Sequence, residues 1–292
     1  VAATGRADVW VSRGVHPFWR DVMATFAAGS GHRLHVIDLE DGTTAWPEGG
    51  APGAIVLQQP NYLGCLEDVS GAVAVARANG ALAVVAADPV SLGLLKPPGA
   101  FGVDVVVGEG QPFGTPLSFG GPYLGLFACR AEHVRRLPGR LVGETVDVEG
   151  RRAYVTTLRT REQDIRRERA SSNVCTNQTL IAVAFAVHLG WLGTAGLREL
   201  ALRCARGTRY AREALLSVEG VEPLAGAAVL REFAVRLPVD ADVVIERMAD
   251  EGFLAGVPLG DEYGGGLLVA VTERRTKAQV DAYVSALEKV IR

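Results

Sequence analysis

Lysine is scarce in this sequence. Among its 292 residues only three are lysines, Lys96, Lys277 and Lys289, although Lys and Arg together number 30. Chemistry that depends on a lysine amine therefore has few candidates. The formal net charge is −3, and no dense stripe of basic residues stands out. Phosphate-backbone binding needs such a stripe, so nucleic acid is not expected as the main partner.

Cysteine pairs and targeting segments are also missing. Cysteines 65, 129, 175 and 204 form no CxxC pair and no zinc-ligand spacing, which favours a reduced setting. His32 and His35 form an HxxH, but Leu34 and Val36 indicate a strand there, so we expect no metal site. No export signal is visible at the N-terminus, and the longest apolar run, Leu180–Leu192, is too short to span a bilayer. We expect a soluble, cytoplasmic protein without a membrane partner.

The first half of the sequence alternates short apolar runs with helical patterns. Apolar runs separated by helices are typical of a mostly parallel sheet covered on both faces. The expected helices cover 17–28 and 66–79, the second capped by Gly80. The expected strands are Val9–Ser12, Leu34–Ile37, Ala54–Gln58, Leu82–Ala86, Val103–Val107 and Leu124–Ala128.

The second half has a different pattern. A charged helical segment is expected over 160–169, apolar helices over 173–192 and 196–216, and then strands over 232–237 and 267–271 around a helix over 241–251. Thr276 and Gln279 form a capping box for a last helix with an apolar face. The predicted organisation is a large α/β domain over 1–157, bridging helices over 158–218 and a small α+β domain over 219–292.

This layout is that of fold-type I pyridoxal-phosphate enzymes, although layout alone is weak evidence. Ligands of such sheets gather at the carboxyl ends of the strands, where Gln58–Asn61, Asp88 and Glu109–Gln111 stand. The cofactor needs a lysine for the Schiff base and an acid at its pyridine nitrogen. Asp88 fits that acid or, more simply, starts a turn before Pro89. None of the three lysines follows a strand, so the chain alone should not hold the cofactor.

Several long motifs occur in a recognisable order. Gly108–Gly125, Leu137–Asp147 and Leu158–Gln178 carry the most specific patterns, and Gln58–Gly64 and Ala270–Thr276 agree with them. With these motifs the chain resembles subunit 1 (alpha) of the two-subunit glycine decarboxylase, the P-protein of the glycine cleavage system, from about residue 5 to the end. The resemblance implies the fold-type I architecture, with a seven-stranded type of sheet. It also implies that roughly the first third of the family's subunit 1 is absent from this sequence.

The resemblance implies a division of labour between two homologous subunits. Pyridoxal phosphate is carried by subunit 2 (beta), which has a lysine where this chain has Gln111. Asp88 matches the partner's pyridine-binding acid and is here a relic or a residue of a shared site. Glycine is decarboxylated on the partner's cofactor, and the aminomethyl group passes to the lipoyl arm of the H-protein.

The other candidate residues each have a purely structural explanation as well. The loop with Ser118, Gly120 and Gly121 either turns the chain or borders the partner's site, since successive glycine amides suit an anion. Asn61, Arg140, Arg161, Arg166 and Arg167 are candidates for interface packing or, less favoured, substrate contact. Asn173 is expected to cap a helix, and Cys175 beside it to be an inert buried thiol.

The predicted function is thus that of a non-cofactor-bearing subunit of glycine decarboxylase, with no catalytic residue and no metal of its own. Two alternatives stay open. One is a stand-alone aminotransferase-type enzyme, which would show cofactor absorbance that depends on Lys96. The other is a scaffold or binding module with this fold, which would form no active complex with subunit 2.

Overall fold

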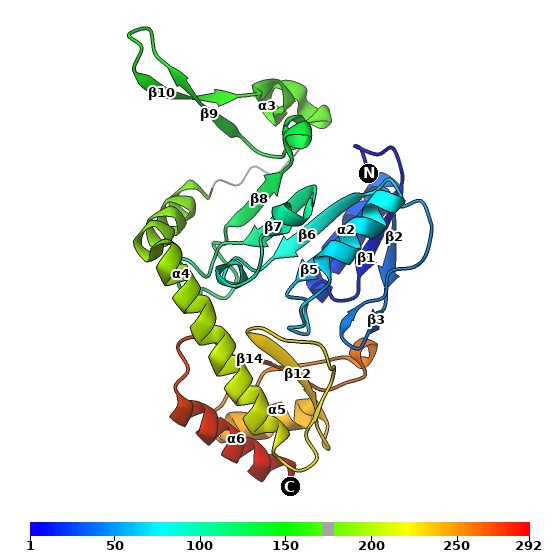
Figure 1. Ribbon diagram of the computed structural model, residues 1–292, viewed down its shortest axis with the longest axis vertical. Coiled ribbons are helices and arrows are strands. Elements are labelled where there is room, and N and C mark those ends of the chain that lie inside the picture. The colour runs from blue at the N-terminus through cyan, green and yellow to red at the C-terminus, as the bar shows by residue number, and fades with distance from the viewer. Residues whose placement is uncertain (171–177) are drawn as a thin grey trace.

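The larger sheet has six strands. The computed structural model describes residues 1–170 and 178–292, and its strands run in the order β2-β1-β5-β6-β7-β8 (Figure 1). The first five are parallel, and β8 joins β7 antiparallel. Their bounds are β1 Asp8–Ser12, β2 Arg33–Ile37, β5 Ala54–Gln59, β6 Leu82–Ala87, β7 Val105–Glu109 and β8 Gly125–Cys129. The mostly parallel sheet is confirmed with six strands among the described residues, one fewer than the seven-stranded type, and β7 begins two residues later than expected.

Two helices pack against this sheet, α1 Pro17–Ser30 and α2 Val69–Ala78. α2 starts later than expected because the side chain of Asp68 accepts a hydrogen bond from the backbone N–H of Gly71 and fixes the first turn. It ends at Ala78, and its C-cap is Asn79, one residue before the predicted Gly80 cap. Ile55, Leu57, Val73 and Val85 form the centre of the core between α2 and the sheet.

A two-stranded hairpin projects from the sheet domain. It pairs β9 Leu141–Val146 with β10 Arg152–Thr157 and extends beyond the six-stranded sheet in Figure 1. The charged helix expected over 160–169 is wrong as a single element. Arg167 has a φ of +53°, which no helix allows, so the segment splits into η4 Arg159–Arg161, α3 Gln163–Arg166 and η5 Arg167–Arg169.

A 38-residue helix, α4 Thr179–Leu216, leads from the sheet domain to the small domain (Figure 1). It merges the two expected apolar helices and breaks at Gly193, where φ is +60° and ψ −176°. By length and composition it is the one described helix that could cross a membrane. The break leaves its apolar first part shorter than the roughly 20 uninterrupted residues that a spanning helix needs.

The small domain is an antiparallel sheet covered by two helices. Its strands run in the order β11-β12-β14-β13, with bounds Glu222–Pro223, Glu232–Arg236, Leu267–Ala270 and Val257–Pro258. Helices α5 Ala241–Asp250 and α6 Lys277–Ile291 pack on it, and the predicted capping box of α6 is confirmed. Phe233, Leu267 and Leu287 lie at the centre of its separate core.

The two sheets meet through the loop that follows β5. Leu63 and Cys65 of this loop are buried with Ala234, Leu259 and Leu268 of the small domain. Backbone pairing supports the contact, since Leu230 N–H donates to Gly64 O at 3.0 Å and Leu66 N–H to Ala228 O at 2.8 Å. The loop that carries the polar residues after β5 is therefore also the joint between the two domains.

Candidate functional site at the carboxyl edge of the sheet

The parallel register brings the predicted polar residues to one edge. Gln59 pairs with Ala87 across β5 and β6, and the N–H of Asp88 donates to the carbonyl of Gln59 at 3.0 Å. Ala86 pairs with Val107, so Asp88 and Glu109 end adjacent strands at matching heights. The expectation of a polar edge after β5, β6 and β7 is met by this arrangement.

Asn61 is the centre of a buried hydrogen-bond network. Its amide nitrogen donates to Gly42 O at 2.7 Å and to Glu67 Oε1 at 2.8 Å, and its Oδ1 accepts from the N–H groups of Leu63 and Cys65. Thr44 donates to Glu67 from both its N–H and its hydroxyl. Every polar atom of the Asn61 side chain is thus used within the chain, and its geometry supports a structural role rather than substrate contact.

Asp88 is paired with a cation. Its Oδ2 lies 2.5 Å from Nη1 of Arg231, which comes from the small domain just before β12. Its Oδ1 accepts from the N–H of Val90 at 3.0 Å, the turn geometry that sequence alone also allowed. Both side chains are about three-quarters buried, at 22% and 24% exposed. Both oxygens of this carboxylate are therefore engaged within the chain.

Gln111 lies just beyond the end of β7. Its side-chain nitrogen donates to Thr115 O at 2.8 Å, and its backbone N–H donates to Glu109 Oε1 at 2.9 Å. Glu109 Oε1 also accepts from Leu124 N–H at 2.8 Å. Glu109 thereby ties together the two ends of the loop 110–124, and Gln111 braces its first turn.

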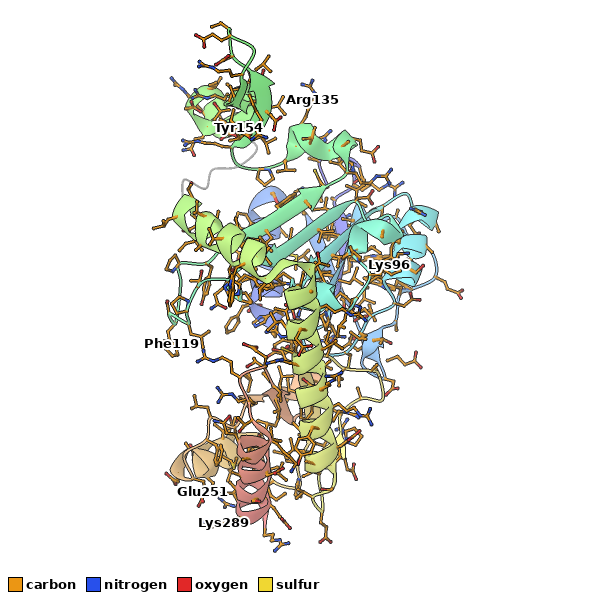
Figure 2. The ribbon with its side chains drawn as sticks, turned by 60° about the vertical axis from the view of Figure 1, so that its left-hand side comes forward. Lys96, Phe119, Arg135, Tyr154, Glu251 and Lys289 are labelled. Atoms are coloured by element: carbon orange, nitrogen blue, oxygen red, sulfur yellow. The ribbon has the colours of Figure 1, made fainter. Side chains whose placement is uncertain are left out.

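The tip of this loop points away from the chain. Phe119 is 99% exposed and Leu117 80% exposed, and Figure 2 shows Phe119 at the outer side of the molecule. Phe119 has a φ of +50°, and Gly120 and Gly121 follow at +135° and +115°. Ser118 is exposed, and its hydroxyl bonds only to the carbonyl of Pro116 at 3.3 Å. Among the described residues, the backbone N–H groups of Gly120 and Gly121 make no hydrogen bond to the rest of the chain.

Pyridoxal phosphate does not fit this chain on its own. Lys277 and Lys289 pair with Asp281 and Glu251 on and beside α6, and Lys96 lies over the ring of Phe101 at 4.4 Å. None of the three lysines directly follows a strand of the larger sheet, and Figure 2 shows Lys289 far from that sheet, on the small domain. With Gln111 unable to form an imine and Asp88 already paired, two of the cofactor's requirements are unmet.

The arginine candidates lie elsewhere. Arg140 and Arg159 line a cavity of about 210 Å³ at the base of the hairpin, where Arg159 also pairs with Asp164 at 2.6 Å. Arg166 Nε donates to Thr160 O at 3.1 Å, and Arg161 belongs to η4. Arg140 and Arg166 therefore lie near the hairpin and not at the strand edge. Asn173 and Cys175 lie outside the described residues.

Two residues of the site were not predicted. Arg231 and Glu67 bond to residues that the sequence did flag, Asp88 and Asn61. Glu109 was flagged together with Gln111, and its carboxylate accepts from the Gln111 N–H. Nothing local marks Arg231, because its partner Asp88 is 143 positions away.

Glu232, next to Arg231, has an unusual acidity. Burial raises its pKa to about 7, with Arg231 acting in the opposite direction and Asp88 in the same one. A glutamate whose pKa is higher in the folded chain than in the unfolded one binds more protons when folded. The folded state then loses stability as pH rises from about 4.5 to 7.

We therefore expect the stability of Glu232→Gln, relative to that of the natural chain, to increase as pH rises. The difference in free energy of unfolding should grow by up to about 2 kcal/mol between pH 5 and pH 8, a value reduced from about 3 for residual solvent screening. Urea unfolding at a series of pH values measures it. A difference that is constant with pH would show that Glu232 titrates normally.

The architecture defines the class of this protein. It has the fold of fold-type I pyridoxal-phosphate-dependent enzymes, which it shares with a cysteine desulfurase from Escherichia coli at a TM-score of 0.68 and with an alanine–glyoxylate aminotransferase from Nostoc at 0.68. Their sequence identities of 15% and 19% establish the fold alone.

The family is more specific. The model of the glycine cleavage system P-protein matches residues 2–287, and the chain belongs to that family. It is similar to a crystal structure of glycine decarboxylase (P-protein) in inhibitor-bound form, with 45% identity, a TM-score of 0.96, and coverage of 99% of this chain and 67% of that one. It is also 46% identical to the probable glycine dehydrogenase (decarboxylating) subunit 1 of Prosthecochloris aestuarii and 43% identical to that of Moorella thermoacetica.

The match covers only part of each relative. It covers 97% of this chain and 65% of the Prosthecochloris protein, and 99% and 67% for the Moorella protein. The chain therefore spans about two thirds of the length of its curated relatives.

Proposed function

We propose that this chain acts as the non-cofactor-bearing subunit of a cytoplasmic glycine decarboxylase. The observation that carries the proposal is the pairing of strong family similarity with an edge that holds Gln111 and a neutralised Asp88 in place of cofactor ligands. The partner would be the lysine-bearing subunit 2. Its pyridoxal phosphate would act as the electron sink for loss of carbon dioxide from glycine, and the lipoyl arm of the H-protein would accept the aminomethyl group.

Exposed apolar side chains support a partner subunit. On the first part of α4, Leu180, Val187 and Trp191 are 79%, 67% and 81% exposed at helical spacing, although the opposite side of the same helix packs against Phe113. On α1, Phe18 and Phe26 are 73% and 72% exposed. Helix faces in water are normally polar, so apolar stripes of this kind indicate surfaces that another chain covers.

The role of this chain in such a complex follows from its rigid edge. Glu109 and Gln111 fix the base of the loop 110–124, so its exposed tip is presented in one position. The successive amides of Gly120 and Gly121 can then face an anionic group of the partner. This chain would shape and close the partner's site and exclude water from it.

The direct test is reconstitution. The chain is co-expressed with the lysine-bearing subunit, and release of labelled carbon dioxide from glycine is measured with lipoylated H-protein. We expect a stable complex that is active and a chain that is inactive by itself. A complex without activity would favour a scaffold, and cofactor absorbance of the chain alone, abolished by Lys96→Ala, would favour a stand-alone aminotransferase-type enzyme.

Replacing Gly120 with tryptophan should lower the activity of the reconstituted complex at least about ten-fold. At a φ of +135° a side chain is strained, and an added Cβ meets nothing within 4 Å, so the bulk would project from the tip toward the partner. Gly5→Trp is the control, since Gly5 also has a positive φ and open space. Equal activity of the two variants would show that the loop does not border the partner's site.

A further inference from the structure

Arg231 is an unusual residue in an unusual place. Its backbone has a φ of +65°, which bulky residues rarely adopt, and its carbonyl accepts from Val271 N–H at 2.8 Å, so the strained turn is held by the small sheet. The side chain reaches from there to the carboxyl end of β6. A strained backbone that aims a long cation at one carboxylate indicates that the contact itself is important.

The surroundings of Arg231 are acidic and mostly buried. Besides Asp88 it faces Glu232 and the thiol of Cys204 on α4, and the sulfur of Cys204 lies 3.8 Å from Glu273 Oε2. Its Nε is buried and has no hydrogen-bond partner among the described residues. A guanidinium buried with one donor unused is costly, and its ion pair with Asp88 is the main compensation that the geometry offers.

The ion pair of Asp88 and Arg231 resembles the contact that an acid makes with the ring nitrogen of a pyridoxal cofactor. A pyridoxal cofactor presents a protonated ring nitrogen to an acid at the end of a strand, and the acid is stabilised by that positive charge. Asp88 stands at such a strand end and receives a positive N–H donor from Arg231 instead. The guanidinium and a pyridinium cannot occupy this carboxylate together.

We propose that Arg231 replaces the cofactor's pyridinium in this chain, so that the Asp88 carboxylate is already occupied by a cation of the small domain. Asp88 is then retained for its partner in the fold. The same ion pair fastens the small domain to the sheet, beside the contact between the loop after β5 and residues 228–230. This inference concerns the chain by itself and holds whether or not the proposed function is correct.

A double-mutant cycle tests the pairing. Arg231→Met should lower the urea midpoint by roughly 0.5 M because Asp88 is left unpaired. Adding Asp88→Asn to Arg231→Met should raise the midpoint again, whereas Asp88→Asn in the natural chain should lower it. Arg231→Lys keeps the charge, so its urea midpoint should lie close to that of the natural chain. If Asp88→Asn lowers the midpoint equally in both backgrounds, the two groups are not coupled and the proposal is wrong.

Affinity for the cofactor tests whether Arg231 keeps it from Asp88. Pyridoxal phosphate alone is the probe, in equilibrium dialysis. Gln111→Lys should bind it weakly, and Gln111→Lys with Arg231→Met should bind it at least ten-fold more tightly. Adding Asp88→Asn to this pair should reverse the gain, and Gln111→Lys with Arg231→Lys should behave like Gln111→Lys. Equal affinities with and without Arg231, including no binding by either, overturn the claim that Arg231 keeps the cofactor from Asp88. Neither readout depends on glycine decarboxylation or on a partner subunit.

Discussion

Replacing Gly64 with alanine is expected to lower the free energy of unfolding by about 3 kcal/mol, from strain of about 1–2 kcal/mol at positive φ plus a steric clash. Gly64 has a φ of +80°, and an added Cβ would stand 1.9 Å from the carbonyl oxygen of Glu232 and 2.3 Å from its carbonyl carbon. Both obstructing atoms belong to the backbone of the small sheet. Relief would require that the sheet domain and the small domain move apart.

A matched control separates strain from the clash. Gly252 has a φ of +86°, but an added Cβ there meets nothing within 4 Å. Gly252→Ala should therefore cost only the strain, about 1 kcal/mol. Urea unfolding of the two variants measures both values. If Gly64→Ala costs no more than Gly252→Ala, the close approach of the two domains at Gly64 is not what the structure indicates.

The sheet could be predicted because its central strands are largely buried. Runs such as Ala54–Leu57 and Leu82–Ala87 are apolar without alternation, which is typical of a covered parallel sheet. The hairpin β9–β10 was missed for the opposite reason. Its valines are exposed, Val142 and Val146 at 65% each, and form no core, so no burial pattern marks them. The turn at Gly150, with a φ of +76°, was the available signal.

The candidate site could be located from sequence but not explained from it. Gln111 and Asp88 were placed by strand ends and by family resemblance, and both stand at the carboxyl edge. What neutralises Asp88 depends on a contact across the domain joint, and sequence patterns describe neighbours along the chain only. The error over 160–169 has a similar cause. The residues favour a helix, but the backbone takes a positive φ at Arg167, which ends α3 after Arg166.

The second large effect is expected at Phe119. Phe119→Asp should weaken binding of the proposed partner subunit about 100-fold, as for a central aromatic contact in an interface. The ring is 99% exposed and packs against nothing that would be lost on replacement. Aspartate also tolerates the φ of +50° better than phenylalanine does, so the isolated chain should keep its stability. A loss of affinity without a loss of stability would identify the ring as an interface residue.

Leu254→Asp is the matched control for Phe119→Asp. Leu254 is 98% exposed, undergoes the same apolar-to-acid change, and lies in the small domain after α5. Titration of each variant with the lysine-bearing subunit, followed by analytical ultracentrifugation, gives the two affinities. If both variants lose affinity equally, added negative charge is the cause and not the missing ring. If neither does, the tip of the loop 110–124 lies outside the interface, and its rigid base at Glu109 serves the fold of this chain alone.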